Sequence, residues 1–440
     1  MNKKPVIFLF CMITLLVSSQ NNYHFNNYTI NDGLSQSVVN SLVQDNSGSI
    51  WIGTQDGLNR FDGQSFEIFT SDNTKGIQSI DFLCSMKSKN GDLWFGTSNG
   101  LTKYDPILER FITFNYSSQF ALQVRTIVED NAGNVWIGTI SNGIYILKKN
   151  AKKIIKASIN IPSERIYKIS FISSTELIIS TEDKGVFIHH FPEKNTYSIG
   201  LNGKKGRFIR LNTIQKFNGN DWIIGSSQGL YLMNKLTKNI KPFLTKLDRN
   251  FGYLDISDIS IINVNKFLLT TKSNGLFTIF ISSSGVNIHH STQDIFQKQA
   301  LLYDALNTMI RDENGTFWIG SQRGLSSFDP LNQGFLGVGP TGDLTKGIPT
   351  PSVWSFSEDK SGRYLFIGLE SAVSRIDKKT GMFIPFFKPK ELDNSSFTSN
   401  VLTSYVISPS DILVGASDGL FLLNISSKKE YTFKKLSSKI

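Results

Sequence analysis

Short apolar runs separated by glycine-containing turns recur along the whole chain. Residues 37–44 mix apolar and polar positions, and residues 49–54 form a nearly continuous apolar run after a turn that contains Asp45 and Gly48. Short apolar runs bounded by turn residues indicate strands, and a continuous run indicates a strand buried on both faces. The pattern therefore predicts an all-β chain built from hairpins.

The pattern around Trp51 is a repeat. It returns in nearly the same form around Trp94, Trp136 and Trp318, and five weaker copies bring the total to nine. The turn glycines from Gly57 to Gly324 are separated by 42 to 49 residues. A period in the forties made of short strands predicts β-propeller blades of four strands and about 43 residues each.

Single residues fit this blade. Asp45 can accept hydrogen bonds from nearby amides, Gly48 tolerates a positive φ, and Gly53 lets the adjacent blade approach closely. The four tryptophans occupy a fixed place in the second strand of their blades. We therefore interpret them as blade-to-blade packing and not as a sugar-binding platform.

The repeats suggest how the chain is divided. Residues 22–330 would form a seven-bladed β-propeller, with residues 23–30 as the outer strand of its last blade, and residues 331–440 would form two further blades. Two unclosed blades would expose apolar edges. The alternative is one larger propeller over residues 22–440, although propellers usually have about four to eight blades.

The first residues and the charge bear on location and partners. Residues 1–19 have the order of a signal peptide, because Lys3 and Lys4 precede an apolar run that is too short to span a membrane. We expect export to the periplasm, where Cys84 would be the one remaining cysteine. A net charge of +10 favours acidic sugars or a lipid surface, or reflects lysines on solvated edge strands. Export makes nucleic acid an unexpected partner.

The repeated phrase resembles a known family. The motif that runs through Asp45, Gly48, Trp51, Gly53 and Gly57 is similar to the two-component regulator propeller repeat, although blades 4, 5, 6, 8 and 9 lose its Trp, its Gly or both. The resemblance implies a periplasmic, non-enzymatic ligand-binding sensor for glycan-derived oligosaccharides. No kinase or cyclase segment is recognisable in the chain, so the expected partner is a membrane sensor kinase or another output protein. A propeller scaffold for protein partners is an alternative.

Candidate ligand-binding residues follow from the repeat register. Counting back 11 residues from the Trp position predicts one residue per blade at the channel entrance, namely Asn40, Leu83, Arg125, Tyr167, Asn212, Ser257 and Asn307. Arg125 could grip a carboxylate or sulfate with two parallel hydrogen bonds, and Arg165 and Arg210 could join it. Alternatively, these arginines pair with acidic residues of the rim. Turn residues such as Gln55, Ser98 and Gln322 would lie on the same rim.

An enzyme needs a constellation that the sequence does not offer. The turn from Asp45 to Trp51 resembles the Asp-box of sialidases, but we find no accompanying arginine cluster with a tyrosine nucleophile, so a glycan hydrolase or lyase is the less favoured alternative. The adjacent pairs His189–His190 and His289–His290 would point to opposite faces of their strands and are interpreted as surface residues. We therefore predict no catalytic residue, no metal site and no cofactor.

Overall fold

The fold is almost entirely antiparallel β-sheet. A computed structural model describes residues 23–116, 121–200, 208–295, 297, 299–331, 345, 347–370, 372–386, 400–408, 410–425 and 431–437. They form nine four-stranded sheets, and the chain divides into two compact units. The seven-bladed unit comprises residues 22–294 and 299–334, and the two-sheet unit contains residues 335–440. The predicted propeller fold is confirmed, and the proposed signal peptide at 1–19 lies outside the described residues.

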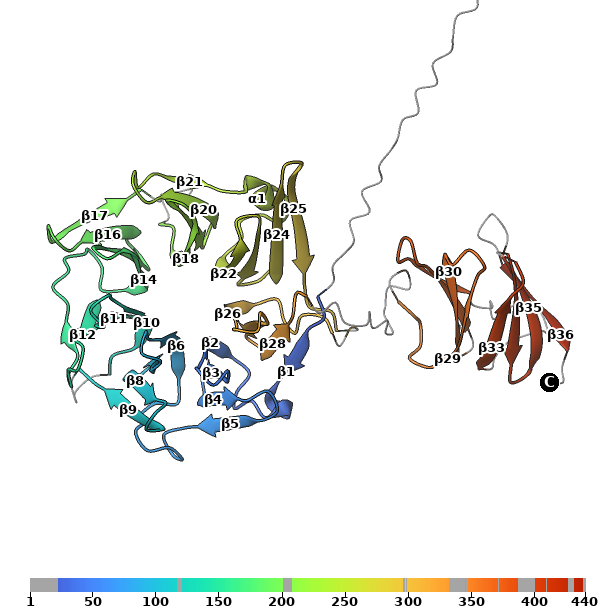
Figure 1. Cartoon of the computed structure of the whole chain (residues 1–440), viewed down its shortest axis with the longest axis horizontal. Helices are drawn as coiled ribbons and strands as arrows, with labels where there is room; N and C mark the ends of the chain where they lie inside the picture. Colours follow the sequence, from blue (N-terminus) through green and yellow to red (C-terminus); the bar gives the residue numbers. More distant parts are fainter. Residues whose placement is uncertain are drawn as a thin grey trace, which may run out of the picture. The chain divides into compact units, whose positions relative to one another are not determined.

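In blades 1 to 6 of the seven-bladed unit, the four strands follow one another along the chain from the channel outward (Figure 1). Blades 1 and 2 contain β2 (Val39–Gln44), β3 (Ile50–Thr54), β4 (Leu58–Phe61), β5 (Phe66–Phe69), and β6 (Phe82–Lys87), β7 (Leu93–Thr97), β8 (Gly100–Asp105), β9 (Arg110–Phe114). Blades 3 and 4 contain β10 (Val124–Glu129), β11 (Val135–Thr139), β12 (Ile144–Leu147), β13 (Ile155–Lys156), and β14 (Ile166–Ser173), β15 (Glu176–Thr181), β16 (Val186–His190), β17 (Asn195–Ile199). Blades 5 and 6 contain β18 (Leu211–Asn218), β19 (Asp221–Ser226), β20 (Gly229–Asn234), β21 (Ile240–Pro242), and β22 (Ile256–Asn263), β23 (Lys266–Thr271), β24 (Leu276–Ser282), β25 (Gly285–Ser291).

The ring is closed by strands from both ends of the seven-bladed unit. Blade 7 contains β26 (Leu306–Arg311), β27 (Phe317–Ser321) and β28 (Leu325–Phe328), and its outer strand is β1 (Asn26–Tyr28). In the register of this pair Asn27 lies opposite Ser326. The inner strand of each blade contacts that of the next, and β26 contacts β2. Pairing β28 with β1 leaves no open edge at the seam of the ring.

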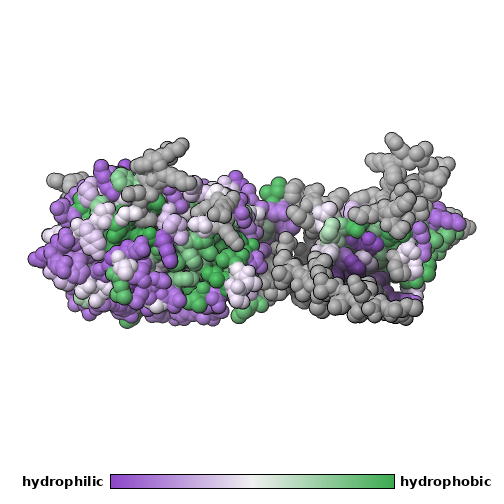
Figure 2. Space-filling view, turned by 90° about the horizontal axis from the view of Figure 1, so that it is seen from above, coloured by the Kyte–Doolittle hydropathy of each residue, from purple (hydrophilic) through white to green (hydrophobic). Residues whose placement is uncertain are grey.

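The core consists of layers between neighbouring blades. Trp51 is fully buried, and its ring centroid lies 4.6 Å from that of Tyr104 and 6.0 Å from that of Phe95, both in blade 2. A Cβ at Gly53 would stand 2.9 Å from the Cβ of Phe82, so a glycine is needed where the blades meet. The packing role predicted for Trp51 is confirmed. Hydrophilic side chains cover much of the visible surface of this unit (Figure 2).

Two helical turns and two further sheets complete the structure. The 3-10 helix η1 (Ile30–Asp32) follows β1, and α1 (Thr245–Phe251) joins blades 5 and 6. The two-sheet unit packs one sheet against another: β29 (Val353–Glu358), β30 (Tyr364–Leu369), β31 (Ala372–Asp377), β32 (Phe383–Phe386), and β33 (Val401–Val406), β34 (Asp411–Ala416), β35 (Gly419–Ile425), β36 (Tyr431–Ser437). Phe356 and Tyr405 on its inner strands are exposed. In the described part of the chain no helix has the length and apolar character needed to span a membrane.

Candidate functional site at the mouth of the ring

Every inner strand of the ring carries an irregularity at the same place. The register of each inner strand skips one residue shortly after the strand begins, and the skipped residues are Asn40, Leu83, Arg125, Tyr167, Asn212, Ser257 and Asn307. These are the seven positions that the repeat register predicts. A β-bulge re-aims the side chain of its extra residue. We call the end of the ring that carries the bulges the mouth.

Three of the predicted site residues hold neighbouring blades together. The amide nitrogens of Asn40, Asn212 and Asn307 donate to the backbone carbonyl oxygens of Phe82, Ile256 and Val39 at 3.2, 2.7 and 3.0 Å. Each acceptor is the first residue of the next inner strand. These asparagines therefore link adjacent blades through the same side-chain to backbone hydrogen bond in three places of the ring.

Three more predicted site residues, Arg125, Tyr167 and Arg210, lie together in a charged cluster. The guanidinium carbons of Arg125 and Arg210 lie 4.1 and 4.9 Å from the ring centroid of Tyr167. The Glu182 carboxylate accepts from both arginines, at 3.3 Å from Arg125 and 2.8 Å from Arg210. A carboxylate and an aromatic ring thus fix two guanidinium groups from blades 3 and 5 beside each other.

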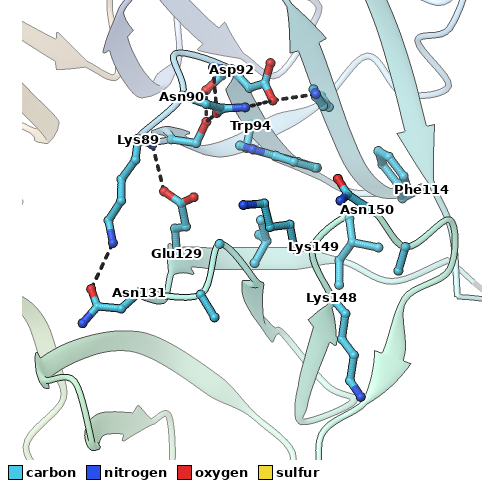
Figure 3. Close-up of a pocket in the computed structure, with 17 residues that line it drawn as sticks. Lys89, Asn90, Asp92, Trp94, Phe114, Glu129, Asn131, Lys148, Lys149 and Asn150 are labelled. Atoms are coloured by element: carbon cyan, nitrogen blue, oxygen red, sulfur yellow. Dashed lines mark hydrogen bonds and ion pairs between the residues drawn. The ribbon is translucent and has the colours of Figure 1, made fainter.

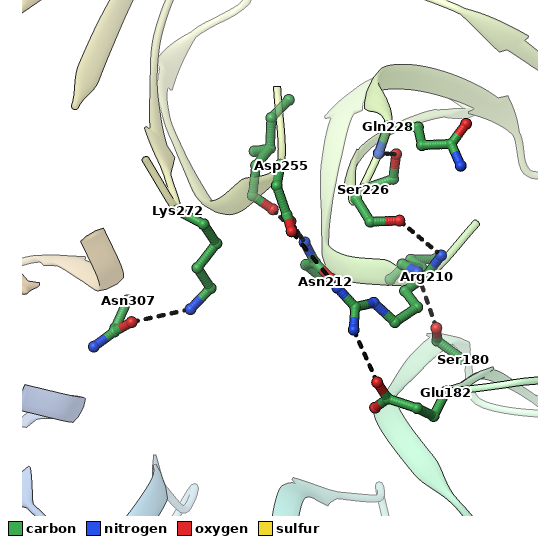
Figure 4. A network of polar contacts seen from close by, with 12 residues as sticks. Ser180, Glu182, Arg210, Asn212, Ser226, Gln228, Asp255, Lys272 and Asn307 are labelled. Carbon is green, nitrogen blue, oxygen red and sulfur yellow. Dashed lines mark hydrogen bonds and ion pairs between the residues drawn. The ribbon is translucent and has the colours of Figure 1, made fainter. Parts of the chain in front are cut away.

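The cluster continues around the mouth into blades 6 and 7 (Figure 4). Asp255 lies 3.6 Å from Arg210 and accepts from the Asn212 amide at 2.7 Å. The Lys272 ammonium donates to the Asn307 side-chain oxygen at 3.0 Å. Asp255 therefore joins blade 6 to the cluster on Tyr167, and the bond between Lys272 and Asn307 joins blade 6 to blade 7.

Burial changes the titration of these groups. Burial alone would lower the pKa of Arg210, but Tyr167, Glu182 and Asp255 outweigh it and raise that pKa. Burial lowers the pKa of Lys272, and the cation of Arg125 acts in the same direction. An anion placed beside Lys272 would offset this cost, because it favours the protonated amine.

Arg165 does not join this cluster. Its side chain is exposed, and among the described residues it has no hydrogen bond or ion pair, whereas its backbone oxygen accepts from the Glu182 amide at 2.9 Å. It still adds a positive charge at the mouth. Within the cluster itself, the three cations of Arg125, Arg210 and Lys272 stand against the two carboxylates of Glu182 and Asp255.

Sequence reasoning missed three members of the cluster. Glu182 and Lys272 directly follow β15 and β23, which is the repeat position of Gln55, and Asp255 directly precedes β22. Extending the count from Gln55 to the weak repeats would have found Glu182 and Lys272. The resulting ion pairs agree with the alternative in which the arginines pair with acidic residues of the rim.

A second layer lies deeper in the ring. Asp258 accepts from the Thr213 hydroxyl at 3.1 Å and from the Met309 amide at 3.1 Å, which joins three consecutive blades. Burial raises the pKa of Asp258, and Lys168 opposes this shift. Burial also raises the pKa of the Cys84 thiol to about 12, so this thiol is protonated at neutral pH.

The histidines do not form a metal centre. His189 and His190 pair with consecutive residues of β15, so they point to opposite faces as predicted. The prediction that both are surface residues is wrong for His189, which is buried and bonded to the Thr196 hydroxyl at 2.8 Å. Both faces of a blade are covered by neighbours, so a strand residue can be buried on either face. The described residues contain no group of three or more metal-binding side chains.

Comparisons with known proteins identify what the chain resembles. The model of the two-component regulator propeller family matches residues 33–56 and 118–141. Over 64 residues the chain is 45% identical to histidine kinase P4 of Formosa agariphila, a match that covers 14% of this chain and 5% of that protein.

Solved structures share the fold. The extracellular domain of a hybrid two-component system of B. thetaiotaomicron matches 93% of this chain with a TM-score of 0.69 and 20% identity, and 54% of its own length is covered. The extracellular domain of a second hybrid two-component system of B. thetaiotaomicron matches with a TM-score of 0.59 and 20% identity. This match covers 91% of this chain and 59% of that domain. Virginiamycin B lyase of Staphylococcus aureus matches with a TM-score of 0.53 and 10% identity. This match covers 70% of this chain and 99% of the lyase. The chain thus spans little more than half of either extracellular domain.

Proposed function

Because the chain carries two-component regulator propeller repeats, we propose that it is an exported sensor module that binds a ligand without chemically changing it. The observation that carries the proposal is the pair of arginines on Tyr167 at the mouth. Arg125 and Arg210 keep 34% and 30% of their side-chain surface exposed while Tyr167 and Glu182 hold them in place. Preorganised and accessible guanidinium groups suit recognition better than structural support.

The chemistry of the mouth favours an acidic, glycan-derived oligosaccharide. Each guanidinium has about five N–H donors, and the described contacts leave most of those of Arg125 and Arg210 unused. A uronate or sulfate group could accept two of them in parallel. The asparagines and rim turns of the other blades add neutral hydrogen-bonding groups that suit sugar hydroxyls.

A sensing role is favoured over catalysis because the two carboxylates of the cluster on Tyr167 are already engaged. Glu182 accepts from two arginines, and Asp255 forms an ion pair with Arg210 and accepts from Asn212, so neither carboxylate is poised as a general acid or base. The five histidines are His24 before β1, two at the end of β16 and two in β25, all away from the bulges. Ligand binding would change the relative placement of blades or units, and a membrane sensor kinase or other output protein would read that change.

The experiment is a binding screen of the full chain with neutral and acidic oligosaccharides, followed by calorimetry. We expect a saturable signal with an acidic glycan and about a tenfold or greater loss of affinity in Arg125→Ala, because a hydrogen bond to a charged group contributes about 1.5–3 kcal/mol. Arg110→Ala on the outer strand β9 is the matched control and should bind normally. An Arg125→Ala protein that binds as well as the parent would contradict the site.

The same samples test the alternatives. Mass spectrometry of the incubated oligosaccharide should show an unchanged mass, and cleavage products absent from a heat-inactivated control would establish a hydrolase or lyase instead. Failure of a folded protein to bind any neutral or acidic glycan would overturn glycan sensing and favour a scaffold for protein partners.

A further inference from the structure

A cavity of about 310 Å³ lies between blades 2 and 3, at the end of the ring opposite the mouth. Its walls are the turn before β7, the hairpin between β10 and β11, and the turn after β12 (Figure 3). Trp94, Phe114 and Leu147 give it an apolar side, and Glu129 and Lys149 give it a polar side. The mouth residues take no part in it, so this cavity is independent of the proposed sensing site.

Trp94 differs from its counterparts in the other blades. The indole nitrogens of Trp51, Trp136 and Trp318 donate to the carboxylates of Asp45, Asp130 and Asp312 at 2.7, 2.9 and 2.8 Å. In each case the aspartate precedes the tryptophan by six residues. These turns leave no indole N–H for a ligand.

In blade 2 the aspartate is replaced by Ser88. The Ser88 hydroxyl bonds to the Asn90 side chain and to the Asp92 carbonyl, and it does not reach the indole. The Trp94 side chain is only 8% exposed, its indole N–H has no acceptor among the described residues, and the indole nitrogen is not fully buried, so this N–H is open to the cavity. An acceptor on a ligand that fills the cavity would therefore find a hydrogen-bond donor that no protein group uses.

The charges around the cavity favour an anion. Lys103 is neutralised by Asp92 at 2.5 Å, and Lys89 donates to Asn131 at 3.0 Å. Lys149 has no ion pair within the described part of the chain, and in Figure 3 its side chain reaches toward the Trp94 indole. The exposed Lys148 adds a second cation, and Glu129 is the opposing carboxylate.

We propose that this cavity binds a small organic acid. A carboxylate or sulfate oxygen of the ligand accepts from the Trp94 indole N–H and pairs with the Lys149 ammonium, while the body of the ligand packs on Phe114 and Leu147. The volume of about 310 Å³ suits one sugar-acid unit. The replacement of aspartate by Ser88 creates this site, because a carboxylate at position 88 would occupy the indole and repel an anion.

The test is NMR of the full chain labelled with ¹⁵N at the indoles of its six tryptophans, with the Trp94 signal assigned by Trp94→Phe. D-glucuronate and inorganic sulfate are titrated separately to about 20 mM, a range that detects affinities weaker than millimolar. We expect a saturable shift of the Trp94 indole signal, and fixed signals of Trp51, Trp136 and Trp318. A shift with sulfate as well as glucuronate assigns recognition to the anionic group, and a shift with glucuronate alone assigns it to the whole acid.

Two variants distinguish binding from a structural effect. Ser88→Asp should abolish the shift while the protein stays at least as stable as the parent, because it restores the turn of blades 1, 3 and 7. Lys149→Gln should weaken binding about tenfold, and Lys152→Gln, which changes an exposed lysine outside the cavity, should not. The proposal is overturned if neither anion shifts the Trp94 indole signal, or if neutral D-glucose shifts that signal as much as the anions do. It is also overturned if the anions shift the Trp94 signal of Ser88→Asp as much as that of the parent.

Discussion

The turn between the first and second strands of blades 1, 3 and 7 makes a quantitative prediction for Asp45→Ala. The Asp45 carboxylate is 6% exposed and accepts from the backbone amides of Ser47 and Ser49, both at 2.9 Å, and from the indole of Trp51 at 2.7 Å. Trp51 is fully buried, so no water replaces the lost acceptor. The alanine variant therefore removes a charged acceptor and leaves a buried donor unpaired.

The expected cost follows from these contacts. An unsatisfied buried N–H costs about 1–3 kcal/mol, and the hydrogen bonds of a charged group contribute about 1.5–3 kcal/mol each. The two amides lie at the edge of the turn and regain part of their bonds from water. We therefore expect the free energy of unfolding of the seven-bladed unit to fall by about 3–5 kcal/mol.

Urea unfolding followed by tryptophan fluorescence can isolate this unit. Trp354 is the one tryptophan of the two-sheet unit, so in a Trp354→Phe background all the remaining tryptophans report on the ring. Asp56→Ala, which removes an exposed carboxylate in the same blade, is the control and should change stability by less than about 0.5 kcal/mol. A loss below about 1 kcal/mol for Asp45→Ala would refute the reasoning, because it would mean that water or the turn itself satisfies the indole.

Two further predictions concern the blade interfaces. Gly53→Ala should destabilise the ring by about 1–3 kcal/mol, because the new Cβ would stand 2.9 Å from that of Phe82 and would also meet the Ser41 hydroxyl oxygen. The measurement is urea unfolding, with Gly200→Ala as the control because Gly200 has open space around it. Equal losses of stability in the two variants would contradict the packing argument. Burial lowers the pKa of His189, and His190 adds to the shift. Below the ordinary pKa of 6.5 the unfolded chain therefore takes up a proton that the folded chain resists, so stability should fall on acidification by up to about 1.4 kcal/mol per pH unit for this group. His189→Gln should flatten that dependence, and parallel pH profiles for the two proteins would contradict it.

Local features of the fold could be predicted because the residues that determine each turn and strand lie within a single repeat. Gly48 and Gly57 have φ values of 92° and 104°, the left-handed region that their place in a turn demands. Asp45 bonds the amides after it, as predicted. Its bond to the Trp51 indole was missed, although the spacing of six residues recurs at Asp130 and Asp312 and could have indicated it.

The repeat pattern predicts that Trp51 packs between blades, but it does not predict which charged side chains pair across blades. Arg125 and Glu182 are 57 residues apart, and they meet only because the ring places blade 3 beside blade 4, with the bulge at Arg125 and the turn after β15 both at the mouth. The burial of His189 also depends on neighbours, since the alternation along β16 says which side chains share a face but not what covers that face.

The bulge positions argue that the cluster at the mouth serves recognition more than stability. Asn40, Asn212 and Asn307 use this position for a bond to the next blade, and that bond is available to any blade with a short amide there. Blades 3 and 4 carry Arg125 and Tyr167 instead, and among the described residues neither side chain makes the equivalent bond. At this position the ring instead has the partly exposed ion pair of Arg125 and Glu182, and such an ion pair adds little stability in water. Because this substitution does not favour stability, Arg125→Ala should weaken ligand binding far more than it weakens the fold.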